Sequence, residues 1–291
     1  MNRKVVIVII AHNEALRENE KRSLQQCYTV LGSYHTIVIC PENMNVSIYK
    51  AIHPAAEFMF IDPKWQANYR MFNKLKMDET FYKQFNRFKY VLYYELDAWV
   101  FRDELIAWCD KGFDYIGAPW TGLYIYDDGP MTGTGNGGFS LRNIKSTLQL
   151  LHKIRMLGIL EEYQYFNWRG LLPRIPVLLT RVFRAKRKPG IIETTYDMQE
   201  DTFWCKYAPD RLQAFKPGNL FLRWLASLLI SNTFRIAPEK DAAAFSFETR
   251  PVEMYEINNH RLPFGCHAWE KYDPSFWQPY IGQGAGASSS R

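Results

Sequence analysis

The feature that most constrains this chain is an apolar run close to its start, VVIVIIA at residues 5–11. Six of these seven residues are β-branched, which favours a strand over a helix. Because the run contains no polar residue, both faces of the strand must be buried, as happens in the helix-covered sheets of α/β proteins. The run is too short to span a membrane and is followed by His12-Asn13-Glu14 without a signal-peptide cleavage site.

Similar short apolar runs recur along the chain, and they predict further buried strands at 36–40, 57–61 and 90–94, with shorter strands at 114–117 and 137–141. A helix between the first two strands is expected to be capped by Asn19 and ended by Gly32. The order β-α-β-β implies a right-handed crossover. Further helices are predicted within 69–88, the second one starting at Asp78, and at 143–156 and 199–207, whereas 221–280 is expected to be aromatic and irregular.

No repeat or linker divides the chain, so we expect one domain over residues 1–281 with a C-terminal extension. The Gly/Ser-rich segment 282–291 is expected to be a disordered tail or an expression-derived remnant. The five cysteines form no CxxC or CxxH pair, which argues against a disulfide framework or a zinc ribbon. A reduced, cytosolic setting follows.

The formal charge of +6 is concentrated in one segment, 169–188, where seven basic residues face no acidic residue. Without that segment the chain has a charge of −1. A nucleic-acid binder would need basic surface elsewhere, so this class is excluded. The segment, an insertion at about 160–190, also carries many Leu, Ile and Val residues. Either it lies on an anionic membrane surface, or it is a solvated helix that covers part of the core.

Two carboxylates follow the strand at 90–94, in Glu95-Leu96-Asp97. In open α/β sheets, ligands bind beyond the carboxyl ends of the strands. On an extended backbone, side chains two residues apart share a face, so both carboxylates would point the same way. Such a pair is suited to Mg²⁺ or Mn²⁺ with phosphate oxygens completing the shell. A solvated pair at a strand end is the alternative.

Three other sites could carry chemistry. The Gly-rich segment 134–140 lacks the P-loop and Rossmann spacings, so it is either a tight turn or a place where backbone approaches a ligand. Glu200-Asp201 opens an aromatic helix and could cap that helix or act as a general base. His267 stands in an otherwise apolar loop, as a structural group or a metal ligand.

Taken together, these motifs resemble a bacterial family of GT-A-type glycosyltransferases, an uncharacterised family associated with surface-polysaccharide and lipopolysaccharide synthesis. The resemblance runs from about residue 5 to 272. It rests on four phrases: YELDAWVF at 94–101, DYIGAPW at 114–120, GNGGFSLR at 135–142 and PFGCHAW at 263–269.

The resemblance implies a GT-A-like (Rossmann-like) fold with a mixed, mostly parallel central sheet flanked by helices. It implies a hexosyltransferase-type enzyme that moves a sugar from a nucleotide-sugar donor, with UDP expected, to a hydroxyl of a glycan or lipid-linked acceptor. Mn²⁺ or Mg²⁺ would be the cofactor. The expected place is the cytoplasm, including the inner face of the cell membrane as a peripheral protein.

The resemblance also implies roles for individual residues. Asp97 and His267 match the metal ligands, and Glu95 departs from the first Asp of the family's DxD motif, so it would touch metal, ribose or metal-bound water. Asp201 matches the general base, with Glu200 as its substitute. The residues expected to border the donor and the acceptor are Ala11, Asn13, Glu42 and Asn73 around the nucleoside, Gly137 and Gly138 at the sugar and acceptor, and Trp120 stacked on a sugar ring.

Direct displacement with a general base would invert the anomeric centre. Three other readings stay open at this point: a non-catalytic sugar-nucleotide or glycan-binding domain, a metal-dependent hydrolase using the same Asp and His, and a retaining transferase. Release of free sugar without acceptor would identify the hydrolase, and the configuration of the product would separate retention from inversion.

Overall fold

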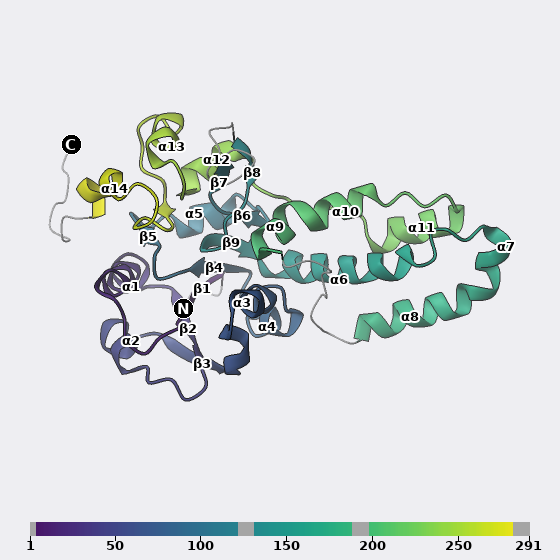
Figure 1. Cartoon of the computed structure of the whole chain (residues 1–291), viewed down its shortest axis with the longest axis horizontal. Helices are drawn as coiled ribbons and strands as arrows, with labels where there is room; N and C mark the ends of the chain where they lie inside the picture. Colours follow the sequence, from purple (N-terminus) through teal and green to yellow (C-terminus); the bar gives the residue numbers. More distant parts are fainter. Residues whose placement is uncertain (1–3, 122–130, 188–197, 282–291) are drawn as a thin grey trace.

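The computed structural model describes residues 4–121, 131–187 and 198–281 (Figure 1). The predicted tail at 282–291 and Lys188 of the basic segment lie outside the described residues. The predicted limits of the domain therefore stay a prediction. Within the described ranges, no helix has both the length and the apolar character needed to cross a membrane.

A six-stranded sheet forms the centre of the molecule (Figure 1). Its strands, in the order in which they pair, are β3 (Glu57–Ile61), β2 (His35–Pro41), β1 (Val5–Ile10), β4 (Tyr90–Tyr94), β9 (Phe139–Asn143) and β6 (Tyr115–Ile116). The first four are parallel, and β9 runs antiparallel to both of its neighbours. The predicted fold class, a mixed and mostly parallel sheet flanked by helices, is confirmed.

The central strand β1 is buried along its whole length, as its composition requires. Val6, Val8 and Ile10 belong to the core on one face of the sheet. Val5, Ile7 and Ile9 belong to the core on the other face. Because successive side chains of a strand point to opposite faces, a strand without polar residues demands cover on both sides.

Helices connect the parallel strands, because parallel neighbours cannot be joined by a hairpin. Helix α1 (Glu18–Leu31) begins one residue before the predicted cap, with Arg17 at the N-cap position, and ends at Gly32 as predicted. The expected direct step from β2 to β3 is wrong, because the short helix α2 (Ser47–Ile52) lies between them. With six residues and one fully buried side chain, Tyr49, it has too little periodicity to be seen in the sequence.

The segment after β3 contains η1 (Pro63–Gln66), α3 (Tyr69–Leu75) and α4 (Glu79–Lys83), the last capped by the side chain of Asp78 as predicted. Helix α5 (Leu105–Asp110) precedes β6, and the hairpin β7 (Pro119–Thr121) and β8 (Met131–Thr134) follows it.

A group of helices extends away from the sheet, and we call it the helical arm (Figure 1). It starts with α6 (Ile144–Glu161), against which α8 (Ile175–Arg187), α10 (Ala208–Ala214) and α11 (Leu220–Leu229) pack. The arm also contains α7 (Trp168–Leu171) and η2 (Leu172–Arg174), which lead into α8. The basic segment is therefore one part of a larger helical unit, and that unit shares a continuous core with the sheet.

Helix α9 (Glu200–Thr202) lies next to the sheet, where Glu200 pairs with Arg142 of β9. A π-helical turn, η3 (Phe203–Tyr207), then leads from α9 into α10 of the helical arm. The predicted helix at 199–207 thus exists but runs on to Ala214. The expectation of irregular structure over 221–280 is wrong, because four helices occupy much of that range: α11, α12 (Glu239–Phe245), α13 (Pro251–Ile257) and α14 (Pro274–Ile281).

A small second sheet joins distant parts of the chain. It consists of β10 (Ser246–Phe247), β11 (Gly265–Cys266) and β5 (Trp99–Val100), in that order. Its strands have two residues each, so no sequence period could reveal them. An aromatic core cluster that includes Trp269 and Trp277 stabilises this part of the fold.

The N-terminus of α6 depends on a side-chain cap. Asn143 accepts a hydrogen bond from the backbone N–H of Ser146 at 3.2 Å. We expect Asn143→Ala to lower the free energy of unfolding by about 1 kcal/mol, the usual cost of losing an N-cap. Urea denaturation measures the change. Asn167→Ala, which removes the cap of the four-residue exposed helix α7, is the control and should cost less.

Candidate active site

Glu95, Asp97 and His267 form one cluster at the carboxyl end of β4. One ligand atom from each residue lies within 4.8 Å of the others. The Nε2 atom of His267 lies 3.1 Å from Oδ1 of Asp97 and 3.5 Å from Oε2 of Glu95. The structure thus brings together three predicted residues, of which Glu95 and His267 are 172 positions apart in the sequence (267 − 95).

The small sheet explains how this cluster forms. Asp97 stands two residues before β5, and His267 comes directly after β11, which pairs with β5. Since β10 pairs with β11 on the other side, the residue that follows β10, Glu248, also reaches the cluster. The backbone N–H of His267 donates to the carbonyl of Phe247 at 3.0 Å and holds the loop in register.

The backbone between the two carboxylates is not extended, and that part of the prediction is wrong. The N–H of Ala98 donates to the carbonyl of Glu95 at 2.9 Å and closes a turn. Both carboxylates nevertheless reach His267, because the turn folds Asp97 back toward the end of β4.

Glu248 is a member of the site that the sequence did not reveal. Its Oε1 atom lies 3.2 Å from Nδ1 of His267. A carboxylate on one ring nitrogen holds the imidazole in place and directs the other nitrogen, Nε2, toward Asp97. Burial lowers the pKa of His267, but the carboxylates of Asp97, Glu248 and Glu95 outweigh burial and raise it well above its usual value.

The three clustered side chains fit a divalent cation. Nε2 of His267 is buried and makes no well-directed hydrogen bond, in spite of its short distance to Asp97. Two carboxylates and an imidazole suit Mn²⁺ or Mg²⁺, and the remaining positions of an octahedral shell would be open to phosphate oxygens and water.

Glu95 also faces a buried lysine. Nζ of Lys76 lies 2.5 Å from Oε1 of Glu95 and 3.4 Å from Oε1 of Glu200. Burial alone would raise the pKa of Glu95, but the charge of Lys76 and the bond from His267 hold it well below its usual range. One oxygen of Glu95 is thus committed to Lys76, which leaves the other for the cluster.

Glu200 lies in a buried ion pair. One guanidinium nitrogen of Arg142 donates to Oε1 of Glu200 at 2.8 Å, and the other lies 2.7 Å from Oε2. Arg142 is fully buried and lies over the rings of Tyr93 and Tyr115. Both carboxylate oxygens of Glu200 are thus engaged by Arg142, and Lys76 lies close to one of them. The expected role of Glu200 as a substitute base stays a prediction.

Asp201 lies next to this ion pair with a different environment. Its Oδ2 atom accepts from the backbone N–H of Asn136 at 3.1 Å, and its Oδ1 atom accepts from Thr202 at 2.7 Å. Burial and the negative charge of Glu200 raise the pKa of Asp201 to about 6. Asp201 is therefore mostly ionised at neutral pH. Its pKa also lies closer to neutral pH than that of an ordinary aspartate, as suits a general base that activates a hydroxyl.

Asn136 connects the two halves of the site. Its backbone contacts Asp201, and its side-chain amide nitrogen lies 3.4 Å from Nδ1 of His267. Its side-chain oxygen accepts from the N–H of Gly138 at 3.0 Å. Asn136 adopts a left-handed backbone conformation with φ of 62°, which Asn tolerates better than most residues.

The two glycines that follow are required by close approach. A Cβ at Gly137 would lie 1.8 Å from Oε1 of Glu200, and a Cβ at Gly138 would lie 2.0 Å from Nε2 of His267. Both are therefore packed against site residues. Their predicted contact with the donor sugar and the acceptor stays a prediction.

The chain was compared with known families and proteins. The model of a family described as "Protein of unknown function (DUF5672)" matches residues 55–267. The chain belongs to this family. The match contains Glu95, Asp97, Asp201 and Glu248 and ends on His267. No curated protein matches the chain.

Solved structures with a similar chain path are glycosyltransferases. One acts in glycosylation of the major capsid of PBCV-1, at 10% identity and a TM-score of 0.43, over 96% of this chain and 98% of that one. Galactosyltransferase LgtC, in complex with donor and acceptor sugar analogues, has 12% sequence identity and a TM-score of 0.43, over 97% of each chain. Core-mannan synthase A from Aspergillus fumigatus, in a Mn/GDP form, has 12% sequence identity and a TM-score of 0.36, over 49% of this chain and 60% of that one. At these scores the likeness assigns no residue a role.

A pocket of about 190 Å³ adjoins the cluster in this member of the DUF5672 family. Asn13 and Glu95, which are predicted to contact the donor, and Asp97, predicted as a metal ligand, are among the residues that line it, together with Arg17 and Tyr49. The phenolic O–H of Tyr49 donates to the carbonyl of Asn13 at 2.7 Å, which fixes the loop after β1. This pocket is the candidate site for the nucleoside.

Other predicted contacts lie elsewhere. Ala11 is buried, and Glu42 is exposed directly after β2; neither lines the pocket. Asn73 does not line the pocket either: its side chain is buried and accepts from the N–H of Glu200 at 3.0 Å, and its expected nucleoside contact stays a prediction. The ring of Trp120 covers Gly135 on the β7–β8 hairpin, where a Cβ would lie 1.9 Å from it.

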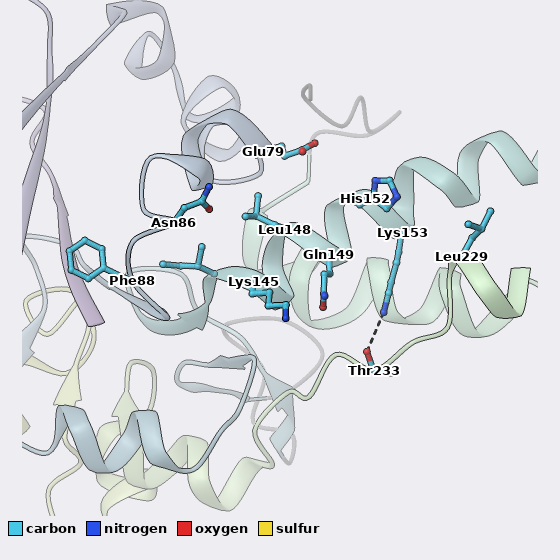
Figure 2. Close-up of a pocket in the computed structure, with 11 residues that line it drawn as sticks. Glu79, Asn86, Phe88, Lys145, Leu148, Gln149, His152, Lys153, Leu229 and Thr233 are labelled. Atoms are coloured by element: carbon cyan, nitrogen blue, oxygen red, sulfur yellow. Dashed lines mark hydrogen bonds between the residues drawn. The ribbon is translucent and has the colours of Figure 1, made fainter. Parts of the chain in front are cut away.

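A larger pocket of about 670 Å³ lies apart from these residues, along the first half of α6 (Figure 2). Figure 2 shows Lys145, Gln149 and Lys153 projecting from α6 toward the same side. Lys153 donates to Thr233 at 3.2 Å and to the carbonyl of Ser231. None of the predicted site residues lines it, so we place the active site by side-chain chemistry and not by volume.

The buried ion pair can be tested directly. Glu200→Gln keeps the shape of the side chain but leaves Arg142 without a charged partner. We expect the free energy of unfolding to fall by about 3–5 kcal/mol, the usual cost of breaking a buried pair. Chemical denaturation measures the change. The control is Glu162→Gln, which breaks the exposed pair with Arg181 and should cost about 1 kcal/mol or less; equal losses would contradict the argument.

Proposed function

We propose that this protein is a metal-dependent glycosyltransferase that moves a sugar from a nucleotide sugar to a hydroxyl of a glycan or lipid-linked acceptor. One observation carries the proposal: Asn136 contacts both Asp201 and His267, so the proposed base and the proposed cation site lie on either side of one residue. A leaving diphosphate and an attacking hydroxyl need those two functions close together.

Asp97, His267 and the free oxygen of Glu95 would hold the cation. Mn²⁺ or Mg²⁺, when bound, neutralises the charge that develops on a leaving diphosphate. Glu248 orients His267, and Lys76 positions Glu95. On the resemblance of the motifs to GT-A enzymes, a uridine diphosphate sugar is the first donor to test, with its nucleoside in the pocket beside Asn13.

Asp201 would accept the proton of the acceptor hydroxyl. Its raised pKa brings its proton affinity toward the working pH, where general-base assistance is most effective. Glu200 supports this role through its charge and its ion pair with Arg142. Direct attack on the anomeric carbon gives inversion, and the pathway we propose is synthesis of a bacterial surface polysaccharide at the cytoplasmic face of the membrane.

The metal site predicts how donor binding responds to mutation. With Mn²⁺ present, a nucleotide sugar should raise the melting temperature of the wild type, and EDTA should abolish the shift, because the cation links diphosphate to protein. Asp97→Ala and His267→Ala should abolish it as well. Glu104→Gln, which alters an exposed ion pair with Arg102, should leave the shift intact. A full shift in Asp97→Ala would disprove the metal assignment.

The base predicts a pH profile. Because Asp201 acts when deprotonated, kcat/KM for transfer should fall about tenfold per pH unit below its pKa of about 6. Asp201→Asn should reduce transfer by about 10²–10⁴-fold, remove this acid limb and keep the Mn²⁺-dependent donor shift. Coupled nucleotide-release assays measure the rates.

The products distinguish the remaining alternatives. Inverted configuration by NMR supports direct displacement, whereas retained configuration would replace it with a retaining mechanism. Release of free sugar at the full rate without acceptor would identify a hydrolase. Donor binding without any turnover over a screen of acceptors would identify a binding domain.

A further inference from the structure

We propose that the end of the helical arm is a docking surface for an anionic membrane. The surface, which we call the arm patch, consists of Trp168 on α7 and Leu220, Trp224 and Leu228 on α11. The inference goes beyond the transferase function and does not depend on it.

Helix α11 carries apolar residues on its exposed face as well as on its buried face. Leu222, Leu225 and Ala226 are buried in the core. Leu220, Trp224 and Leu228 follow one another at intervals of four residues, so they form a stripe on one face. These three side chains are 76%, 57% and 62% exposed. A folded protein gains nothing from such a stripe unless something covers it.

Trp168 extends this stripe onto α7. Its side chain is 54% exposed, and it lines a shallow pocket of about 520 Å³ together with Asn219, Leu220, Phe221 and Trp224. The patch is therefore continuous across two helices that are about fifty residues apart in the chain, as 168 and 220 show. In Figure 1, α7 and α11 lie toward the end of the helical arm that is remote from the sheet.

The charge around the arm patch identifies the partner. The two segments that form this part of the helical arm, 163–187 and 211–229, together contain nine Lys or Arg residues and no Asp or Glu. Glu162 and Glu161, which border them, pair with Arg181 and Arg211. The whole chain has a formal charge of +6, so the remainder carries −3. Five of the basic residues are exposed in the structure: Arg169, Arg174, Arg184, Lys216 and Arg223.

A lipid surface fits these features better than a protein or a glycan. Exposed Trp and Leu can enter the boundary between headgroups and acyl chains, while each nearby cation contributes about 1 kcal/mol on anionic lipid. A second copy of this chain would bring like charges together across the contact, which is unfavourable. A glycan would need several hydrogen-bonding groups, but besides the indole N–H groups of Trp168 and Trp224 the pocket lining offers only Asn219, whose side-chain oxygen already accepts from the N–H groups of Phe221 and Leu222.

Vesicle sedimentation tests the proposal with the full chain. Wild type should bind vesicles of equal parts phosphatidylcholine and phosphatidylglycerol, bind phosphatidylcholine alone at least about tenfold more weakly, and lose most of its binding to the anionic vesicles in high salt. The triple variant Leu220→Ser, Trp224→Ser, Leu228→Ser should lose at least about tenfold in partitioning to the anionic vesicles. So should the variant Arg169→Gln, Arg174→Gln, Lys216→Gln, Arg223→Gln.

The matched control is Val252→Ser with Ile257→Ser, two exposed apolar residues of α13, which should bind like the wild type. All variants change exposed residues, and circular dichroism melting confirms that they fold. Equal binding of wild type and the triple variant would overturn the proposal. A concentration-dependent dimer in size-exclusion chromatography that the triple variant loses would overturn it too, in favour of a contact between copies.

Discussion

The buried ion pair between Arg142 and Glu200 is the interaction on which the rest of this structure depends. Arg142 belongs to β9 of the central sheet, and Glu200 begins the segment that leads through η3 into α10 of the helical arm. Removing two charges from water is costly, and only a well-made pair offsets that cost. The pair therefore holds the start of α9 in one place against the sheet. It decides where Asp201 lies, and through Lys76 it also reaches Glu95.

This arrangement separates charges that maintain the fold from charges that are available for chemistry. Lys76, Arg142 and Glu200 are buried and engaged with one another. Asp97 and His267, at the edge of the pocket beside Asn13, and Asp201, with its raised pKa, are the groups that could act on a ligand. Gly137 makes the separation possible, because a side chain there would displace the carboxylate of Glu200.

Much of the sheet could be predicted, because a strand buried on both faces must be apolar throughout. The limits predicted for β3 and β4 match the structure, and those for β2 extend by one residue at each end. Helix α2 and the two-residue strands of the small sheet were not predicted, because each is too short for a periodic pattern to repeat. The helices after residue 220 were not predicted. In α11 the exposed face is apolar as well as the buried one, which hides the usual alternation of polar and apolar residues.

What the sequence by itself determined is the class of the fold, because strand burial is a local property that can be read from neighbouring residues. The motifs also predict Glu95, Asp97 and His267 as metal ligands through their resemblance to GT-A enzymes, and the structure brings these three side chains together. Only the tertiary structure decided the partners: that Glu200 belongs to Arg142, that Asn73 caps this segment instead of facing the pocket, and that Glu248 orients His267. The physical reason is that a side chain's proton affinity and freedom depend on charges brought close by strand pairing and helix packing, between residues far apart in the chain.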